Sequence, residues 1–430
     1  MRRGFHDVMR AQFFASIADN ALFVATVALL RQNGAPDWQQ AALVSVFAFF
    51  YVVLAPVAGA LADRFPKGRV MLASNTMKIV GCGLMLFTPF PLLAYSVVGL
   101  GAACYGPAKY GIVTEMLPPS QLVKANGWIE GLTVISIILG LALGGALVGT
   151  KATLWLLDVG AFAHGSQITS LPKIAMVFVV GLYGLAALFN LRINATGVAM
   201  QPMPALNYLL RDFYYCNKTL WRDGLGQISL ATTTLFWGVG GPLRYLVIAW
   251  GAVAFGLGIS DATLLMGIVA LGTAAGVLLA SHKTTLVNAT DVLPLGVAPG
   301  LIMIALVWVS SVWVALPFLF ALGCIGGFMV VPMNALLQHR GAVLMSSGRS
   351  IAVQNLNEQL GILAFGTFSS ALTASGMSVL VVLAMLGSVV AVCMALIFYK
   401  HRLNQLTSQT QSVEPPRLPS LLNAPHPEKQ

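Results

Sequence analysis

The chain has 430 residues, of which 57% are hydrophobic and only 9% are charged, and its mean hydropathy is +0.82. A soluble protein carries about 25% charged residues because water must wet its surface, so this composition excludes a soluble enzyme or binding domain. The net charge of +10 does not indicate a nucleic-acid partner, because the basic residues stand between hydrophobic blocks rather than in a patch. At about 20 residues per crossing, the length allows about 12 membrane-spanning helices.

The hydrophobic runs predict an all-α polytopic membrane protein with 12 transmembrane helices in two pseudo-symmetric six-helix halves. The expected helices are 8–31, 41–62, 70–88, 90–112, 125–149, 173–191, 228–254, 261–281, 292–310, 312–336, 348–371 and 377–399. The expected parts are a first half, 1–191, a cytoplasmic linker, 192–227, a second half, 228–399, and a tail, 400–430.

Two of these parts are expected to lie outside the helix bundle. In the linker, apolar residues recur at helical spacing between Leu206 and Tyr214, with Arg211 and Lys218 interspersed, which predicts a helix lying at the membrane interface. The tail 400–430 is rich in proline and polar residues and is predicted to be disordered. The outward loop 149–172 is longer than the others and indicates no function.

The distribution of lysine and arginine predicts the orientation of the chain. With the N-terminus in the cytoplasm, the cytoplasmic segments hold 18 basic residues and the opposite side holds three. Basic residues concentrate in cytoplasmic loops, so both termini are expected in the cytoplasm of a cell whose inner membrane the protein spans. The first apolar run contains Asp19 and lacks a small-residue cleavage site, so we interpret it as a retained helix rather than a signal peptide.

No motif indicates an enzyme, a metal site or a cofactor. The sequence contains no nucleophile elbow, phosphate-binding loop or zinc-protease motif, so no catalytic residue is proposed. The five cysteines are scattered without metal-ligand spacing, and the histidines lie mostly in loops and the tail.

Ionisable residues inside the apolar runs are the first candidates for a functional site. An ionised side chain at the centre of a membrane costs at least about 2.5–3.5 kcal/mol unless it faces protein or water. Asp19 in the first helix and Arg244 in the seventh both lie deep in apolar runs. They are expected to face a central cavity, as an ion pair or with Arg244 receiving an anionic substrate group; a purely structural pair is the alternative.

An internal offset of 225 residues supports this placement. It aligns Gly101 and Pro107 of the fourth helix with Gly326 and Pro332 of the tenth. The same offset matches Lys109 with Asn334, and Asp19 with Arg244. Pseudo-symmetry of the two halves would therefore place these polar residues around one cavity.

Further polar residues are weighed against simpler explanations. Lys109 either lines the cavity or extends its ammonium group to the nearby membrane surface, and Glu130 either lines it or complements a helix dipole. Lys78 is interpreted as a surface-seeking or interhelical residue. In the eleventh helix, four polar residues within five positions cover more than one face, so some must face a cavity or other helices. They are Gln354, Asn355, Asn357 and Glu358.

The second loop reads Gly59-Ala-Leu-Ala-Asp63-Arg64-Phe-Pro-Lys67-Gly-Arg69, which resembles the signature of the major facilitator superfamily between helices two and three. The resemblance implies the fold of that superfamily. It also implies that the loop is a cytoplasmic gating latch, in which Asp63 meets a helix N-terminus of the other half while the basic residues hold the loop.

More specifically, the chain resembles bacterial lysophospholipid transporters. The segments that carry the resemblance include Ala18-Asp19-Asn20-Ala21, Tyr105-Gly-Pro-Ala-Lys109-Tyr110, Lys124-Ala-Asn126-Gly127, Val330-Val-Pro-Met-Asn334 and Ile351-Ala-Val-Gln354-Asn355. The resemblance implies movement of lysophospholipids, chiefly lysophosphatidylethanolamine, to the cytoplasmic leaflet for reacylation. It also implies an acyltransferase–acyl-carrier-protein synthetase as partner, and a charged translocation network of Asp19, Lys109 and Arg244.

Three functions stay open on these grounds. The first is a carrier that binds the zwitterionic lysophospholipid head group, with Arg244 or Lys109 for the phosphate and Asp19, Glu130 or Glu358 for the ammonium. The second is a proton-coupled efflux pump for drugs or sugars, with Asp19 or Glu358 as the proton site. The third is a membrane scaffold for an acyltransferase that transports nothing.

Overall fold

The computed structural model describes residues 3–149 and 170–413, which are helical apart from short connections. The elements of the first part are α1 Arg3–Gln32, α2 Asp37–Arg64, α3 Lys67–Phe87, α4 Pro91–Met116, α5 Pro119–Val148 and α7 Leu171–Leu191. Helix α8, Leu206–Arg222, follows. The remaining elements are α9 Gly226–Phe255, α10 Ile259–Lys283, η2 Ala289–Gly296, α11 Val297–Ala305, η3 Leu306–Trp308, α12 Val312–Leu344, α13 Ser347–Ala374 and α14 Val379–Val413.

Among the described residues, ten helices are long and apolar enough to cross a membrane. Helix α2 bends by 62° just before Pro56, which cannot donate a backbone hydrogen bond. When its two segments are counted as one span, α2 is the eleventh. Helix α13 is long enough but contains the polar run 354–358, which lowers its hydropathy. The predicted all-helical, multi-span class is therefore confirmed, whereas hydropathy supports ten or eleven of the twelve predicted spans among the described residues.

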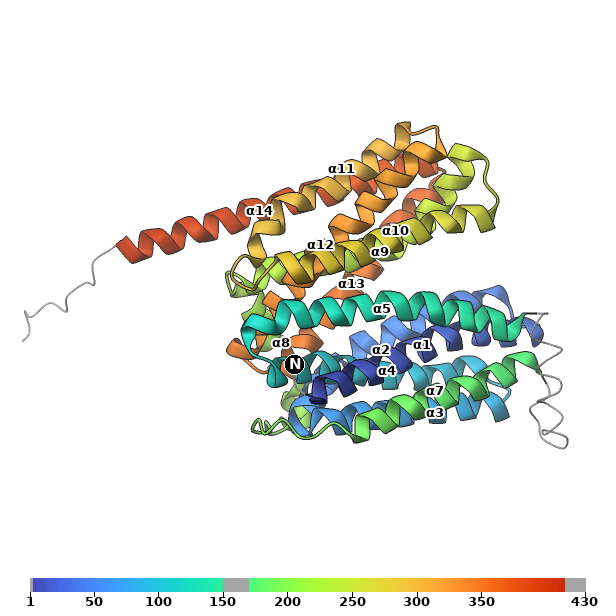
Figure 1. Ribbon diagram of the computed structural model, residues 1–430, viewed down its shortest axis with the longest axis horizontal. Helices are drawn as coiled ribbons and strands as arrows, with labels where there is room; N and C mark the ends of the chain where they lie inside the picture. Colours follow the sequence, from blue (N-terminus) through green and yellow to red (C-terminus); the bar gives the residue numbers. More distant parts are fainter. Residues whose placement is uncertain (1–2, 150–169, 414–430) are drawn as a thin grey trace, which may run out of the picture.

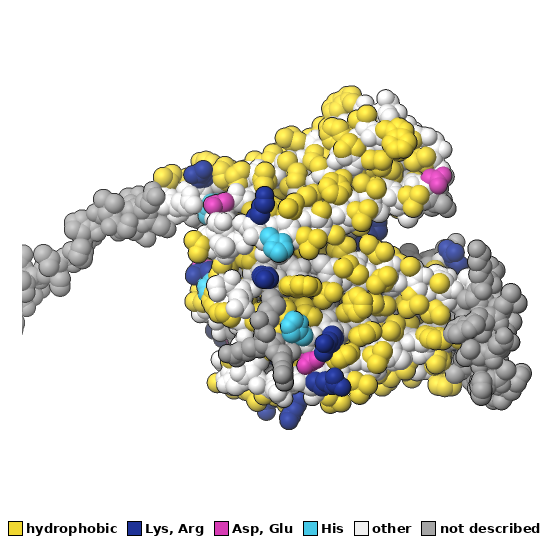
Figure 2. Space-filling view, in the orientation of Figure 1, with side chains coloured by type: hydrophobic (Ala, Val, Ile, Leu, Met, Phe, Trp, Pro, Cys, Tyr) yellow, Lys and Arg dark blue, Asp and Glu magenta, His cyan; other side chains and the backbone are white. Residues whose placement is uncertain are grey.

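The helices pack as two bundles that lie side by side (Figure 1). Helices α1 to α7 form the first bundle, and α9 to α14 form the second. Each bundle has its own apolar core, with Leu22, Leu29 and Met176 in the first and Trp250, Leu319 and Leu386 in the second. The outer surface is hydrophobic across its middle, and lysine and arginine side chains gather toward one end (Figure 2). That distribution suits helices surrounded by lipid.

The two bundles touch toward one end of the molecule. We call the end at which α8 lies and α1 begins the linker end, and the opposite end the open end. Near the linker end, Val277 and Ala280 of α10 and Val330 of α12 share an apolar cluster with residues of the first bundle. At the other end the bundles diverge (Figure 1), and an indentation separates them on the surface (Figure 2). The molecule therefore has a cleft that is closed at the linker end.

Helix α8 lies across the linker end and is held mainly by the second bundle. Its buried side chains, Leu209, Phe213, Cys216 and Leu220, pack against α2, α9, α12 and α13. Its opposite face leaves Leu210 72% exposed and Tyr214 60% exposed. This two-faced helix lies inside the predicted linker 192–227, and its contact with a membrane surface stays a prediction.

The predicted disorder of the tail is wrong for residues 400–413, because α14 continues to Val413. His401 is buried, and the Asn404 side chain donates a hydrogen bond of 3.1 Å to the carbonyl of Gly224. The prolines that suggested disorder begin only at Pro415, whereas Leu403 and Leu406 suit a helix. Residues 414–430 of the tail and 150–169 of the predicted loop lie outside the described residues.

Candidate functional site

A buried ion pair lies inside the first bundle, between α1 and α3. The Lys78 ammonium donates to both carboxylate oxygens of Asp19, at 2.8 and 2.9 Å. The Tyr183 hydroxyl of α7 donates to the same carboxylate at 2.6 Å. The Lys78 side chain is 1% exposed, whereas that of Asp19 is 30% exposed. Asp19 thus keeps one side accessible while Lys78 and Tyr183 hold it from behind.

Aromatic rings complete the surroundings of Lys78. Its ammonium lies 5.1 Å from the ring centre of Tyr105 and 5.4 Å from that of Tyr183. At these distances the ring faces attract a cation. Gly101 of α4 makes the approach possible, because a Cβ there would lie 3.0 Å from Lys78 Cγ and 2.8 Å from the Ser74 carbonyl oxygen.

The structure does not pair Asp19 with Arg244, which was one of the two expected arrangements. Arg244 is exposed on α9, and no carboxylate among the described residues lies within ion-pair distance of it. Asn20, beside Asp19, uses its amide to donate to the Ser16 carbonyl at 2.8 Å. Lys78, interpreted as a surface-seeking or interhelical residue, is an interhelical one and is the partner of Asp19. A charge inside an apolar run indicated that Lys78 needs a partner. The partner could not be identified, because the sequence does not show that α1 and α3 are neighbours.

A second polar cluster joins the two bundles nearer the linker end. Glu130 of α5 accepts hydrogen bonds from the Tyr110 hydroxyl at 3.0 Å and from the Asn334 amide of α12 at 3.1 Å. Asn334 in turn accepts from Gln354 at 2.9 Å, and the same Gln354 amide donates to Glu358 at 2.7 Å. Four of the predicted site residues, Glu130, Asn334, Gln354 and Glu358, thus form one chain of hydrogen bonds across the interface.

Lys109 and Asn355 lie beside this chain without joining it. The Lys109 ammonium lies 4.1 Å from the ring centre of Tyr110. Asn355 packs against α4, where its amide nitrogen lies 2.9 Å from the position of a Cβ on Gly106. One further contact had not been predicted: Asn126 of α5 and Gln338 of α12 exchange two hydrogen bonds, at 2.9 and 2.8 Å, and both side chains are buried. Both residues stand in or beside segments that carry the family resemblance.

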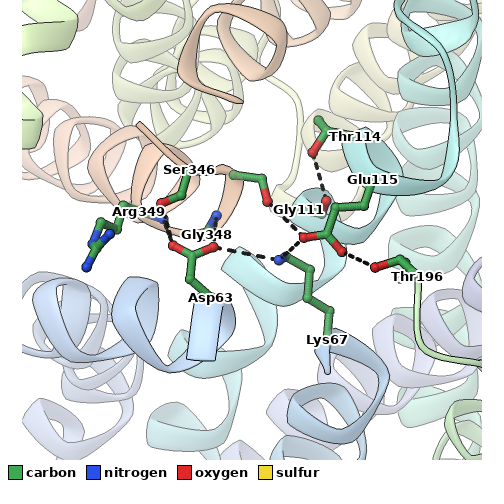
Figure 3. A network of polar contacts seen from close by, with 10 residues as sticks. Asp63, Lys67, Gly111, Thr114, Glu115, Thr196, Ser346, Gly348 and Arg349 are labelled. Atoms are coloured by element: carbon green, nitrogen blue, oxygen red, sulfur yellow. Dashed lines mark hydrogen bonds and ion pairs between the residues drawn. The ribbon is translucent and has the colours of Figure 1, made fainter. Parts of the chain in front are cut away.

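The predicted gating loop forms a network of polar contacts with the start of α13 and the end of α4, as Figure 3 shows. The Asp63 carboxylate accepts hydrogen bonds from the Ser346 hydroxyl at 2.6 Å and from the backbone N–H groups of Gly348 and Arg349 at 2.8 and 3.0 Å. These groups form the N-terminus of α13, where a carboxylate satisfies free N–H groups and suits the helix dipole. A Cβ on Gly348 would lie 2.6 Å from an Asp63 oxygen, so this contact requires glycine.

Lys67 extends the network toward α4. Its ammonium lies 3.6 Å from Asp63 and forms an ion pair with Glu115, which also accepts a 2.6 Å hydrogen bond from Thr196. Glu115 and Thr196 were not predicted, and no local pattern marked them. The other two loop residues, Arg64 and Arg69, have exposed side chains outside this network. The linker end is thus closed by two polar layers, the gating loop and the chain from Tyr110 to Glu358.

Within the described residues, no group of three or more His, Cys, Asp or Glu side chains could hold a metal ion. Of the charged residues that the sequence singled out, Arg244 is exposed, and Asp19, Lys109 and Glu358 are partly exposed. Asp19 and Arg244 stand on helices from different halves and carry opposite charges. A ligand that carries both signs of charge would find a partner for each.

Comparisons with known proteins show the family of the chain. The family model of the Major Facilitator Superfamily matches residues 8–366. The lysophospholipid transporter LplT of Yersinia enterocolitica is 40% identical over 373 residues, which cover 86% of this chain and 87% of the relative. LplT of Yersinia pestis (strain Pestoides F) is 40% identical over 361 residues, 83% of each chain.

Two solved structures share the fold. The fucose transporter FucP in the outward conformation has a TM-score of 0.68 at 16% identity, over 93% of this chain and 98% of FucP. A bacterial homologue of the iron transporter ferroportin, in its outward-facing state, has a TM-score of 0.69 at 16% identity, over 94% and 100%. At such low identity these likenesses concern the fold alone.

Proposed function

The chain belongs to the Major Facilitator Superfamily, and from this we propose that it carries lysophospholipids across the bacterial inner membrane. The observation that carries the proposal is the 40% identity, over most of both chains, to relatives named lysophospholipid transporters. The proposed main substrate is lysophosphatidylethanolamine, delivered to the cytoplasmic leaflet for reacylation by an acyltransferase–acyl-carrier-protein synthetase. The protein itself is proposed to catalyse no reaction.

The charges of the cleft support a zwitterionic head group. Arg244 is exposed and free to bind the phosphate with two parallel hydrogen bonds, which a guanidinium does better than an ammonium. The accessible side of Asp19 suits the ethanolammonium group. Lys78 neutralises Asp19 from behind, so the carboxylate can stay ionised in the membrane before the substrate arrives.

We propose that the linker end is cytoplasmic. The bias of basic residues toward that side supports this orientation, and Figure 2 places lysine and arginine side chains there. The conformation described here then receives substrate from the outer side. Release to the cytoplasm requires that both polar layers open, the Asp63 contacts with α13 and the hydrogen bonds from Glu130 through Asn334.

Uptake of radiolabelled lysophosphatidylethanolamine into proteoliposomes tests the function. We expect uptake by the wild-type protein and by Arg402→Gln, a control that removes an exposed arginine from α14. Asp19→Asn and Arg244→Gln should each lower uptake by at least about tenfold, the effect of one lost charge-assisted hydrogen bond. No uptake by the wild type would contradict lysophospholipid transport. Normal uptake by both variants would contradict the assigned residues and leave the function standing.

An uncoupler separates simple carriage from proton coupling. The same uptake measured in spheroplasts should persist when the proton gradient is dissipated, because a head group with both charges needs no compensating proton at Asp19. Loss of uptake with the uncoupler would instead favour proton-coupled transport, with Asp19 or Glu358 as the proton site.

A further inference from the structure

The second bundle holds a partly open cavity of about 170 Å³ between α9, α10, η2, α11, α12 and α14. The side chains that line it are almost all apolar, and they include Phe236, Met266, Met303, Met329 and Met394. The only hydroxyl groups on its wall belong to Thr232 and Thr273, and each donates to a carbonyl of its own helix, of Ile228 and of Val269. A cavity without a free polar group stays dry and accepts an apolar ligand.

The corresponding space in the first bundle is not empty. The offset of 225 residues that matches Asp19 with Arg244 also matches Lys78 with Met303 and Tyr105 with Val330. In the first bundle Lys78 occupies the interior, beside the ring of Tyr105. In the second bundle Met303 and Val330 line the cavity instead. By this offset, the position that the buried, charged Lys78 takes in the first half is taken in the second half by Met303, an apolar side chain that lines a cavity.

The cavity has an exposed wall at Gly240, four residues before Arg244. Gly240 lines it and is exposed, and a Cβ built on Gly240 would meet no atom within 4 Å. Arg244 follows four residues later on the same face of α9, about 6 Å away along the helix. A molecule whose phosphate binds Arg244 can therefore pass an attached chain by Gly240 into the cavity.

We propose that this cavity binds the terminal part of the acyl chain of the transported lysophospholipid. The inference rests on the proposed function and adds where the apolar part of the substrate goes. A cavity of about 150 Å³ holds a six-carbon ring, so the 170 Å³ here takes roughly six carbons of a longer chain. The four methionine side chains are flexible and adapt to chains of different shape. The charged interior of the first bundle and the apolar interior of the second thus match the two ends of one amphiphile.

Competition between acyl-chain lengths tests this site. Lysophosphatidylethanolamines with acyl chains of 2 and 16 carbons compete with the labelled substrate. Because Gly240 lies about 6 Å from Arg244 along the helix, only the longer chain extends well into the cavity. Gly240→Leu places a side chain at the mouth, and the helix tolerates it because leucine has a higher helix propensity than glycine. The matched control is Gly267→Leu on α10, another exposed glycine with open space around its Cβ, which does not line the cavity.

We expect the wild-type protein and Gly267→Leu to prefer the longer chain, because each buried methylene favours binding by up to about fourfold. In Gly240→Leu the inhibitory concentration of the longer chain should rise while that of the shorter chain stays the same. The ratio of the shorter chain's inhibitory concentration to that of the longer chain should therefore fall by at least about tenfold. An unchanged ratio in Gly240→Leu, with uptake intact, would overturn the acyl-chain site and leave the proposed function in place. Absence of uptake in the wild type would overturn both.

A photoreactive lysophosphatidylethanolamine provides a second measurement that needs no transport. With a diazirine at the end of its acyl chain, the lipid should crosslink to peptides of α9, α11 and α12 that contain Phe236, Met303 or Met329 in the wild-type protein. Gly240→Leu should lose these crosslinks. Crosslinks confined to residues on the outer surface of the bundle would contradict the site.

Discussion

The interiors of the two bundles differ although the bundles share one architecture. In the first, Lys78, Tyr105 and Tyr183 surround Asp19 and fill the space between helices. In the second, methionines and glycines line an apolar cavity, and one of these glycines, Gly240, lies one helical turn from Arg244. From this difference we infer that the two halves bind different parts of an amphiphilic ligand, the charged head group at the first and the acyl chain at the second.

Lys78→Met should produce the largest effect, because it makes the first interior resemble the second. Asp19 then loses its counter-charge in the membrane. A broken buried ion pair costs about 3–5 kcal/mol, and we expect about 2 kcal/mol here because Asp19 keeps contact with water. Thermal unfolding in detergent should detect this loss, and uptake should fall by more than about tenfold.

The conservative and double variants sharpen that result. Lys78→Arg keeps the charge and should retain most of the stability and part of the uptake. Asp19→Asn combined with Lys78→Met should recover stability, because no charge stays unpaired, but not uptake. Recovery of uptake in the double variant would mean that transport does not need a charged interior in the first bundle. It would contradict the proposed difference in role between the two interiors.

Asp63→Asn tests how the two bundles are held together at the linker end. A hydrogen bond to a charged group contributes about 1.5–3 kcal/mol. The asparagine side chain of Asp63→Asn would accept weaker hydrogen bonds from Ser346 and the N-terminus of α13 than the carboxylate does, so the equilibrium should shift toward a conformation that is open at the linker end. A cysteine introduced at Ala352, which packs on Gly59 of α2, should react faster with a thiol reagent in Asp63→Asn than in the wild type. Arg64→Gln, at the exposed neighbour, should react at the wild-type rate.

The pair Asn126 and Gln338 should show a coupling energy smaller than the loss expected for Lys78→Met. Alanine at either position leaves the other amide buried without a partner, at a cost of about 1–3 kcal/mol. In a double-mutant cycle on thermal unfolding, we expect a coupling of about 1 kcal/mol between the two residues. A coupling close to zero would show that the two amides contribute independently and do not tie the bundles together.

The smallest expected effect concerns Asp223, which joins α8 to the second bundle through Arg340. Burial alone would raise the pKa of Asp223, but hydrogen bonds from Arg340 and the Gly226 N–H outweigh burial and hold that pKa below its ordinary value. A carboxyl whose pKa is lower in the folded protein stabilises it above the unfolded pKa of about 3.9 and loses that stabilisation as the pH falls through the folded pKa. The difference in melting temperature between wild type and Asp223→Asn should therefore be constant near pH 6 and disappear in acid. A difference that persists in acid would mean that the ionised carboxylate does not hold α8.

Much of the fold could be predicted from the sequence because the length of an apolar run and the prolines near its ends are local signals of a membrane-spanning helix. The eleventh helix, expected at 348–371, is α13, Ser347–Ala374. The position of Asp63 against the start of α13 agrees with the arrangement that the family resemblance implied. The prediction was wrong at the tail, where composition was averaged over residues 400–430 although the prolines begin only after α14 ends.

The partners within the site could not be predicted in the same way. Lys78 and Asp19 are 59 residues apart, and only the packing of α3 against α1 and α7 decides that they meet. The offset of 225 residues predicts that Asp19 and Arg244 are equivalent positions, but it does not say which side chains surround each of them. The cavity in the second bundle depends on how side chains fill space, which no periodicity of the sequence records.

A structure of the protein with bound lysophosphatidylethanolamine would locate both ends of the ligand at once. We expect the phosphate within hydrogen-bond distance of Arg244, the ammonium at the accessible side of Asp19, and the end of the acyl chain between Met266, Met303 and Met394. A head group bound away from Arg244 and Asp19, or a cavity that stays empty while the chain lies elsewhere, would contradict it.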